Sequence, residues 1–301
     1  MTIQFNCPGC DALIAFHDKH AGKRARCLTC GQIFVIPSAD NEKPKKLKPT
    51  PEVTEPQPGF YKALFLESWK IFFRTENAVP LVFVVAIVCF KFFLAPFLCC
   101  GWLAYFVVWG WLFGFYLNII YESAFGIDKL PEIYLGTSIT FLWYIIKPFL
   151  VFSLTMLAVQ LPFFIGLSMA QDNGITFDNL WQAGAGFHPA WLAILLRTLY
   201  VLGLFLFPMA ILATAVGQDI TFLRPDYIVG PILKAPLPYA AAVALLIAAS
   251  LLETRTTQFE PASIAVVAGR LAINLAVQPI AIIAMRSIGL FYRHYCCYFK
   301  W

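Results

Sequence analysis

Four cysteines near the N terminus are the residues whose type and spacing most clearly indicate chemistry. Cys7 and Cys10 form one Cys-x-x-Cys pair, Cys27 and Cys30 form a second, and sixteen residues separate the two pairs. A structural zinc ion takes four thiolates at about 2.3 Å in a tetrahedron, and each tight turn can present two of them. The spacing therefore predicts that these four cysteines bind one Zn2+ in a small β zinc ribbon over residues 1–37.

A redox dithiol and an iron–sulfur site are the alternatives for the same cysteines, but neither pair has a thioredoxin-like strand–helix context. His17 and His20 are alternative ligands, although four cysteines already complete the tetrahedron. We expect residues 13–16 to form a short strand that pairs with residues 33–36. So small a module buries little apolar surface, and zinc binding, worth about 10–16 kcal/mol in comparable peptides, would supply most of its stability.

The pattern F-x-C-P-x-C-x-A…A-G-K-R-x-R-C-x-x-C-G-x-x-F-x-V/I-P over residues 3–37 resembles a short bacterial zinc-ribbon family called zinc finger/thioredoxin putative. Asp11 stands where glycine is frequent and Leu28 where proline is usual, and neither is a ligand. The resemblance implies zinc binding and no particular activity. Four basic residues against two acidic ones leave residues 1–37 with a net charge of only +2, so we expect a protein partner or a structural cap rather than nucleic-acid binding.

Polar side chains within apolar stretches are the second group that indicates chemistry. Arg270, Asn274 and Gln278 are spaced four apart, so one helix face would present all three to a bundle interior. Lys91, Arg197 and Arg270 each lie about 10–12 Å from the predicted outer end of a span. We predict that these five residues form an anion- or lipid-binding site, with polar contacts between helices and independent snorkelling as the alternatives.

No acidic residue lies within the predicted spans that carry these three cations. A hydrated cavity, an anionic head group or acids in the neighbouring loops would have to offset their charges, and the loop acids are Asp172, Asp178, Glu253 and Glu260. The apolar stretches also lack H-E-x-x-H, G-x-S-x-G and paired acids, so we expect no enzymatic activity. The sequence identifies no small-molecule substrate.

The elements that position these residues follow from the composition. Hydrophobic residues make up 60% of the chain, charged residues 13%, and the mean hydropathy is +0.72, which is typical of a protein in a lipid bilayer. A helix needs roughly 20 apolar residues to cross the hydrocarbon. We predict an all-α polytopic bundle of about six transmembrane helices, with five and seven crossings as alternatives, over residues 79–98, 102–120, 141–168, 190–212, 237–252 and 263–285.

Two segments connect the ribbon to this bundle, which we place at residues 77–301. Residues 38–59 are rich in Pro, Lys and Glu, so we expect a disordered linker. Residues 60–76 carry a broad apolar face with basic residues opposite, which predicts an amphipathic helix in the membrane interface.

The distribution of basic residues predicts the orientation. Eleven of the 22 Lys and Arg precede the first span, six more fall in the 121–140 loop, the 213–236 loop and the C-terminal tail, and only Arg255 lies in an opposite-side loop. The positive-inside rule then places both termini in the cytosol, and the first 30 residues lack the apolar region of a secretory signal. We expect a multi-pass protein of the inner (cytoplasmic) membrane.

Beyond residue 60, the segments "LFLESWKIFF", "FGIDKLPE" and "RSIGLFYRHY" resemble uncharacterised bacterial multi-pass domains of the Yip1-like kind. The resemblance implies a membrane bundle, a class in which roles in lipid traffic or membrane organisation have been inferred. The function that we predict is a membrane-anchored zinc-ribbon adaptor or sensor on the cytosolic side. The alternative is a transporter or lipid-handling bundle with an anion-binding cavity.

Overall fold

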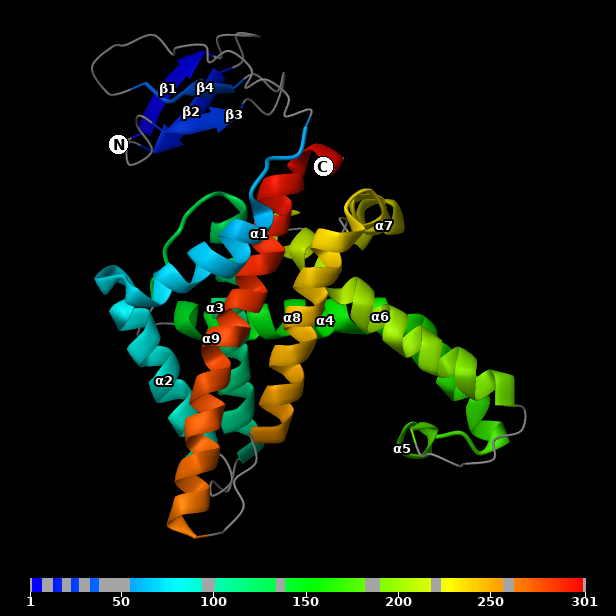
Figure 1. The fold of residues 1–301 in the computed structure, drawn as a ribbon. Helices are drawn as coiled ribbons and strands as arrows, with labels where there is room; N and C mark the ends of the chain where they lie inside the picture. Colours follow the sequence, from blue (N-terminus) through cyan, green and yellow to red (C-terminus); the bar gives the residue numbers. More distant parts are fainter. Residues whose placement is uncertain are drawn as a thin grey trace. The chain divides into compact units, whose positions relative to one another are not determined.

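The computed structural model describes residues 2–6, 13–17, 23–26, 33–37, 55–93, 101–133, 139–181, 190–217, 223–256 and 263–299. The chain divides into two compact units, Met1–Thr54 and Glu55–Trp301 (Figure 1). The described part of the first unit consists of strands and that of the second is mostly helical.

The first unit contains two antiparallel hairpins. Strand β1 (Thr2–Asn6) pairs with β2 (Leu13–His17), and β3 (Arg24–Arg26) pairs with β4 (Ile33–Val35). The predicted pairing of residues 13–16 with residues 33–36 is therefore wrong, because each segment pairs with the strand that precedes it in the sequence. Neighbouring strands close a shorter loop, which costs less conformational entropy.

Aromatic rings from both hairpins form the core of the first unit. Phe34 of β4 is fully buried, and its ring centroid lies 5.3 Å from that of Phe5 on β1 and 6.5 Å from that of Phe16 on β2. Ile36 is also buried and donates its N–H to the Lys23 carbonyl at 2.9 Å. Phe34 thus joins the two hairpins, but the described core is too small to stabilise a fold by burial alone.

The second unit is a helical bundle. Its long helices are α2 (Ala78–Phe93), α3 (Gly101–Ala124), α4 (Ile139–Ala170), α6 (Ala190–Gly217), α8 (Pro236–Thr256) and α9 (Ile264–Tyr295), and the shorter α5 (Phe177–Leu180) and α7 (Pro225–Lys234) lie between them. Helices α4 and α6 run side by side and both contact α3, and the end of this pair nearest α5 extends away from the other long helices (Figure 1).

Five helices in the described part of the chain are long and apolar enough to cross a membrane: Thr75–Phe93, Leu142–Asn173, Ala190–Gly217, Pro236–Glu253 and Ile264–Tyr298. Each overlaps a predicted span. The remaining predicted span, 102–120, falls within the 24-residue helix α3, which is not one of the five.

Helix α9 is the centre of the bundle. It packs against α8 and α3 and also contacts α2 and α6 (Figure 1). The predicted span ended at residue 285, just before Arg286, whereas the helix continues to Tyr295. Arg286 and Arg293, both on α9, pair with Asp128, which follows α3, so its single negative charge offsets part of their positive charge.

The predicted interfacial helix over residues 60–76 is helical but irregular. It consists of the short turns α1 (Phe60–Lys62), η2 (Ala63–Glu67), η3 (Ser68–Phe73) and η4 (Thr75–Asn77). Phe60, Leu64 and Ile71 are buried, and their turns contact α9, whereas Phe65 and Phe73 are exposed. The segment therefore has two apolar sides: one packs against α9, and the other is exposed.

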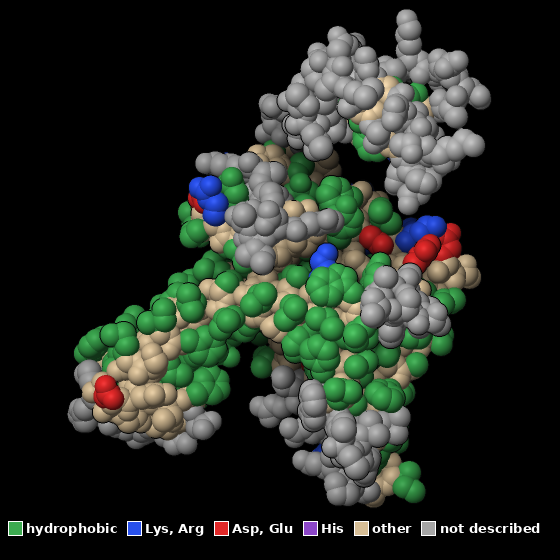
Figure 2. Space-filling view, turned by 180° about the vertical axis from the view of Figure 1, so that it is seen from behind, with side chains coloured by type: hydrophobic (Ala, Val, Ile, Leu, Met, Phe, Trp, Pro, Cys, Tyr) green, Lys and Arg blue, Asp and Glu red, His purple; other side chains and the backbone are tan. Residues whose placement is uncertain are grey.

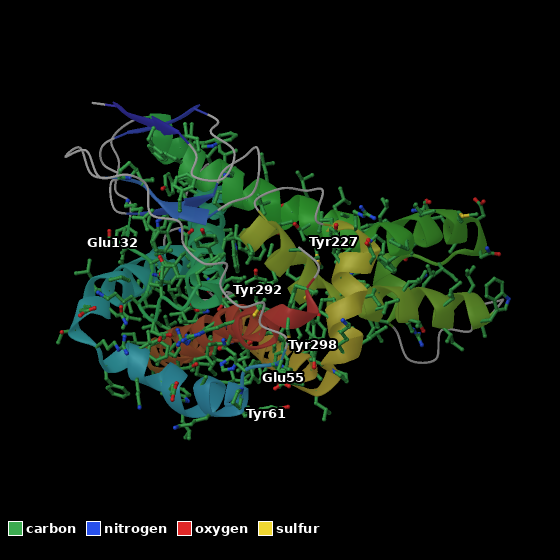
Figure 3. The ribbon with its side chains drawn as sticks, turned by 90° about the horizontal axis from the view of Figure 1, so that it is seen from above. Glu55, Tyr61, Glu132, Tyr227, Tyr292 and Tyr298 are labelled. Atoms are coloured by element: carbon green, nitrogen blue, oxygen red, sulfur yellow. The ribbon has the colours of Figure 1, made fainter. Side chains whose placement is uncertain are left out.

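Residues 55–59, predicted as the end of a disordered linker, belong to the second unit. The Gln57 N–H donates to the His294 carbonyl at 2.8 Å, and His294 Nδ1 lies 3.0 Å from the Gln57 carbonyl oxygen. The Phe60 ring packs against the rings of His294 and Tyr295. These contacts attach the start of the segment to the end of α9, where Figure 3 labels Glu55, Tyr61 and Tyr298. Residues 38–54 of the predicted linker lie outside the described residues.

The close approach of α9 to α3 generates a prediction at Gly289. A Cβ atom there would lie 2.7 Å from Ser123 Cβ and 3.0 Å from the Ala124 backbone nitrogen. We expect Gly289→Ala to force the helices apart and to destabilise the bundle by about 1–3 kcal/mol, read as a lower thermal midpoint in detergent. Gly269→Ala on the same helix is the control, because no atom lies within 4 Å of its added Cβ. Equal midpoints for the two variants would contradict this packing.

Candidate functional site

A buried polar network joins four helices inside the bundle. Lys91 on α2 forms an ion pair with Glu253 Oε1 on α8. Gln278 Nε2 on α9 donates to Glu253 Oε2 at 3.0 Å, and Tyr116 on α3 donates its hydroxyl proton to Gln278 Oε1 at 3.1 Å. The Lys91 ammonium also lies 4.8 Å from the centroid of the Trp109 ring. Each of the four helices thus contributes a polar side chain to one connected cluster.

Lys91 has no solvent-exposed surface in this network, and the Glu253 side chain is 15% exposed. An isolated ammonium group in such surroundings would be strongly unfavourable. The carboxylate of Glu253 and the face of Trp109 offset that cost by direct attraction. The network therefore works as a charge-compensated link between helices, and Lys91 needs no external anion to be stable.

Two members of the network were missed as site residues by sequence reasoning. Glu253 was named only as one of four loop acids, because the predicted span ended at residue 252, whereas α8 continues to Thr256. Tyr116 gave no signal, since a tyrosine in an aromatic-rich helix is more often part of the apolar packing. The position of Lys91 inside an apolar span was the usable signal in the sequence, because a cation within a bundle requires a nearby acid.

Asn274 and Gln278 face the bundle interior, as their spacing predicted, and both are buried. Arg270 lies one helical turn earlier on α9 and is half-buried. Gln278 Nε2 also approaches the Asn274 carbonyl at 3.5 Å. On this polar face Gln278 is engaged with other helices, through Glu253 and Tyr116, and such polar contacts between helices were one of the alternatives that the sequence left open.

Arg197 belongs to a different part of the second unit. Its Nε and Nη2 atoms donate to the Leu180 carbonyl at 2.9 and 2.7 Å. Leu180 ends the short helix α5, and this helix end packs on α4 and α6 in a separate apolar cluster. Arg197 thus satisfies an unpaired carbonyl at a helix C terminus. Of the three cations predicted to share one site, Lys91 is paired with Glu253 and Arg197 with the Leu180 carbonyl, which belong to separate clusters.

A second polar cluster surrounds Asp128. Its α9 member Arg286 lies eight residues after Gln278, which is about 12 Å along the helix axis. Asp128 Oδ1 accepts hydrogen bonds from Arg286 Nη2 at 2.6 Å and from Arg293 Nη1 at 3.4 Å. Arg74 donates to the Asp128 backbone carbonyl at 2.7 Å. The cluster brings together the three segments quoted above, since Arg74 follows the first, Asp128 lies in the second and both other arginines lie in the third.

The electrostatics of this cluster favour the charged carboxylate. Partial burial by itself would raise the pKa of Asp128, but the hydrogen bond from Arg286 and the positive charges of Arg286, Arg293 and Arg74 outweigh it. The pKa of Asp128 therefore lies below its ordinary value. Asp128 holds the loop after α3 to the end of α9.

The metal ligands predicted for the first unit, Cys7, Cys10, Cys27 and Cys30, lie outside the described residues. By sequence, Cys7 and Cys10 fall between β1 and β2, and Cys27 and Cys30 fall between β3 and β4. Within the described ranges, no group of three or more His, Cys, Asp and Glu side chains is arranged to hold a metal ion.

Five membrane-length helices define the second unit as a helical membrane bundle, and three of them, α2, α8 and α9, share the charge-compensated polar network. The face of the molecule shown in Figure 2 is mostly hydrophobic, and few acidic or basic side chains appear on it. This is the surface expected for contact with lipid. Comparisons with known proteins find no family model, no curated protein and no solved structure that matches the chain.

The ion pair of Lys91 and Glu253 leads to a double-mutant prediction. Lys91→Met alone or Glu253→Gln alone leaves one buried partner uncompensated, and each should destabilise the bundle by about 3–5 kcal/mol. The double variant should lose less than the sum of the two losses. Thermal or denaturant unfolding in detergent measures all three, with the exposed Lys70→Met as the control. Strictly additive losses would show that the two side chains do not interact.

The lowered pKa of Asp128 predicts a pH-dependent contribution to stability. Because the carboxylate is favoured in the folded state, its stabilising effect is complete at neutral pH and is lost as the pH falls below about 4, through the folded pKa. Asp128→Asn should therefore lower the thermal midpoint at neutral pH, and its difference from the parent chain should shrink in acid. Asp226→Asn is the matched control, since among the described residues Asp226 forms an ion pair with its near neighbour Arg224 alone, at the surface. A pH-independent difference would rule out this linkage.

Proposed function

We propose that the protein is a membrane-anchored zinc-ribbon adaptor or sensor. In this proposal Cys7, Cys10, Cys27 and Cys30 bind one Zn2+, the ribbon presents a binding surface to a protein partner in the cytosol, and the helical bundle retains it at the inner (cytoplasmic) membrane. The resemblance of residues 3–37 to the short bacterial zinc-ribbon family is part of the proposal.

The observation that carries the proposal is the position of the two cysteine pairs relative to the hairpins. Each pair follows one strand and precedes its antiparallel partner. A Cys-x-x-Cys turn at such a connection presents two thiolates from one place, and Phe34 packs the two hairpins together. The donor set of four thiolates fits Zn2+, which would supply the stability that the small aromatic core lacks.

The bundle supports an anchoring role more than a transport role. Lys91 was one of the three cations predicted to bind an external anion within the membrane, and Glu253 already neutralises it. The Arg197 guanidinium is likewise engaged, by the Leu180 carbonyl. A transporter with an anion-binding cavity at these residues is therefore the less favoured function.

The topology in this proposal has six crossings with both termini in the cytosol. Helix α3 provides the sixth crossing, since its 24 residues rise by about 36 Å, which exceeds the hydrocarbon thickness of about 30 Å. An even number of crossings keeps the ribbon and the C-terminal tail on the same, basic-rich side. A reducing cytosol also keeps the thiols available for the metal.

Zinc content and partner binding test the proposal in the full-length chain. The purified protein should contain about one equivalent of zinc by elemental analysis, and Cys27→Ser should lose it while the helical bundle stays folded. Cys89→Ser, which removes a free cysteine of α2, is the matched control and should retain the metal.

Proximity labelling in cells with the same variants should show whether the ribbon binds protein partners or whether the protein is only attached to the membrane. Proteins labelled by the parent chain and by Cys89→Ser, but not by Cys27→Ser, are the expected zinc-dependent partners. An identical labelled set for all three chains would refute the adaptor role even if zinc is bound. Flux of anions through proteoliposomes of the parent chain, abolished by Lys91→Met, would instead establish the transporter.

A further inference from the structure

A groove of about 820 Å3 runs along α4 and is closed by parts of α3 and the end of α6. Leu150, Leu154, Leu157 and Leu161 lie along it at intervals of three or four residues, so they form one stripe on α4 about 16 Å long. Each of these leucines is between 44% and 49% exposed. The stripe is therefore an apolar surface that the described protein leaves partly uncovered.

One end of the groove carries a cation. Lys147 lies one turn before Leu150, lines the groove and is exposed. In the described part of the chain it forms no hydrogen bond or ion pair, and it is the sole charged side chain that lines this groove. Asn118 and Tyr121 of α3 and Trp143 of α4 line the groove too. Tyrosine and tryptophan favour the head-group level of a bilayer, which marks this end as interfacial.

A small recess adjoins the groove and carries an acid. The recess shares Gly114, Asn118 and Tyr144 with the groove and is also lined by Glu132. The carboxylates of Glu132 and Glu122 repel each other, and Glu122 Oε2 is buried without a hydrogen-bond partner among the described residues. Figure 3 shows Glu132 well apart from the aromatic end of α9, where Tyr292 and Tyr298 are labelled. Neither Lys147 nor Glu132 is thus neutralised by an oppositely charged side chain in the described structure.

We propose that the groove binds one membrane phospholipid with a zwitterionic, amine-bearing head group. The phosphodiester contacts Lys147, the ammonium group lies toward Glu132, and one acyl chain follows the leucine stripe of α4. The site does not involve Lys91 or the zinc ribbon, so it stands independently of the function proposed above.

Charge and shape together favour this occupant over a helix from a second copy of the chain. Such a phospholipid carries its ammonium group, its phosphodiester and its acyl chains in that order, which matches the order Glu132, Lys147 and the leucines in the site. A purely apolar helix would cover the stripe but would leave both charges without partners. The volume also falls in the range of small-ligand sites, roughly 300–1,000 Å3. The second acyl chain would remain in the bilayer beside the exposed leucines.

Native mass spectrometry of the full-length protein, delipidated in detergent and titrated with single lipids, tests the proposal. Phosphatidylethanolamine should bind at one molecule per chain and more tightly than phosphatidylglycerol. Lys147→Gln should weaken binding of both lipids about fivefold, as for one basic residue at a membrane surface. Glu132→Gln should remove the preference for phosphatidylethanolamine. Leu154→Trp should fill the groove and abolish stoichiometric binding of either lipid.

Lys70→Gln is the matched control, because Lys70 is exposed and lies on η3, outside the groove. It should bind both lipids as the parent chain does, and the thermal midpoint of every variant is measured alongside to confirm folding. Equal lipid binding by the parent, Lys147→Gln and Leu154→Trp would overturn the site. Stronger binding of phosphatidylglycerol would overturn the proposed head group. A dimer that Leu154→Trp dissociates would show that a second copy occupies the groove instead.

Discussion

A buried ammonium group cannot remain uncompensated inside an apolar bundle, and this constraint organises the centre of the second unit. Lys91 on α2 has no exposed surface, so the position of Glu253 on α8 is tied to it. Gln278 on α9 donates a hydrogen bond to the second carboxylate oxygen of Glu253, and Tyr116 on α3 donates one to the Gln278 side chain. These contacts fix the positions of the four helices beside one another and the rotation of each helix about its own axis. Apolar packing alone specifies such an arrangement less sharply, because leucine and phenylalanine side chains tolerate alternative contacts.

Helix α9 connects this network to the Asp128 cluster. Its middle carries Asn274 and Gln278, and its later turns carry Arg286 and Arg293, which hold the loop after α3. Gly289 lies between the two arginines and permits close contact with α3. His294, still on α9, binds the backbone at Gln57. One helix therefore organises the bundle through side chains of different chemistry, each within one or two turns of the next.

The two units depend on different physics. The bundle is large, and its helices satisfy their own backbone hydrogen bonds, as a lipid environment requires. The first unit has two short hairpins and a core centred on Phe34, so a metal ion is the natural source of its remaining stability. Zinc affinity and bundle stability should accordingly respond to different substitutions. The groove along α4 adds a third kind of surface, in which bound lipid rather than protein would cover an apolar stripe.

The sequence by itself determined the kinds of structure present. Composition and apolar length were sufficient for a helical membrane bundle, because crossing a bilayer demands about 20 apolar residues regardless of their packing. The period of four placed Asn274 and Gln278 on an interior face for the same local reason. Strands were also predicted near residues 13–16 and 33–36 of the first unit, but their pairing partners were not. Pairing depends on which segment can be reached with the smaller loss of loop-closure entropy.

Only the tertiary structure decided which polar groups meet. Lys91 and Glu253 are 162 residues apart in the chain, and no local periodicity relates positions so distant. Arg197 and Lys91 looked equivalent because their depths along separate helices were similar, yet depth does not specify direction or neighbours. In the structure Arg197 donates to the Leu180 carbonyl, whereas Lys91 pairs with the Glu253 carboxylate. The charge of a side chain can be read directly from the sequence. The group that neutralises it depends on how the helices pack, and helix packing is a property of the whole fold.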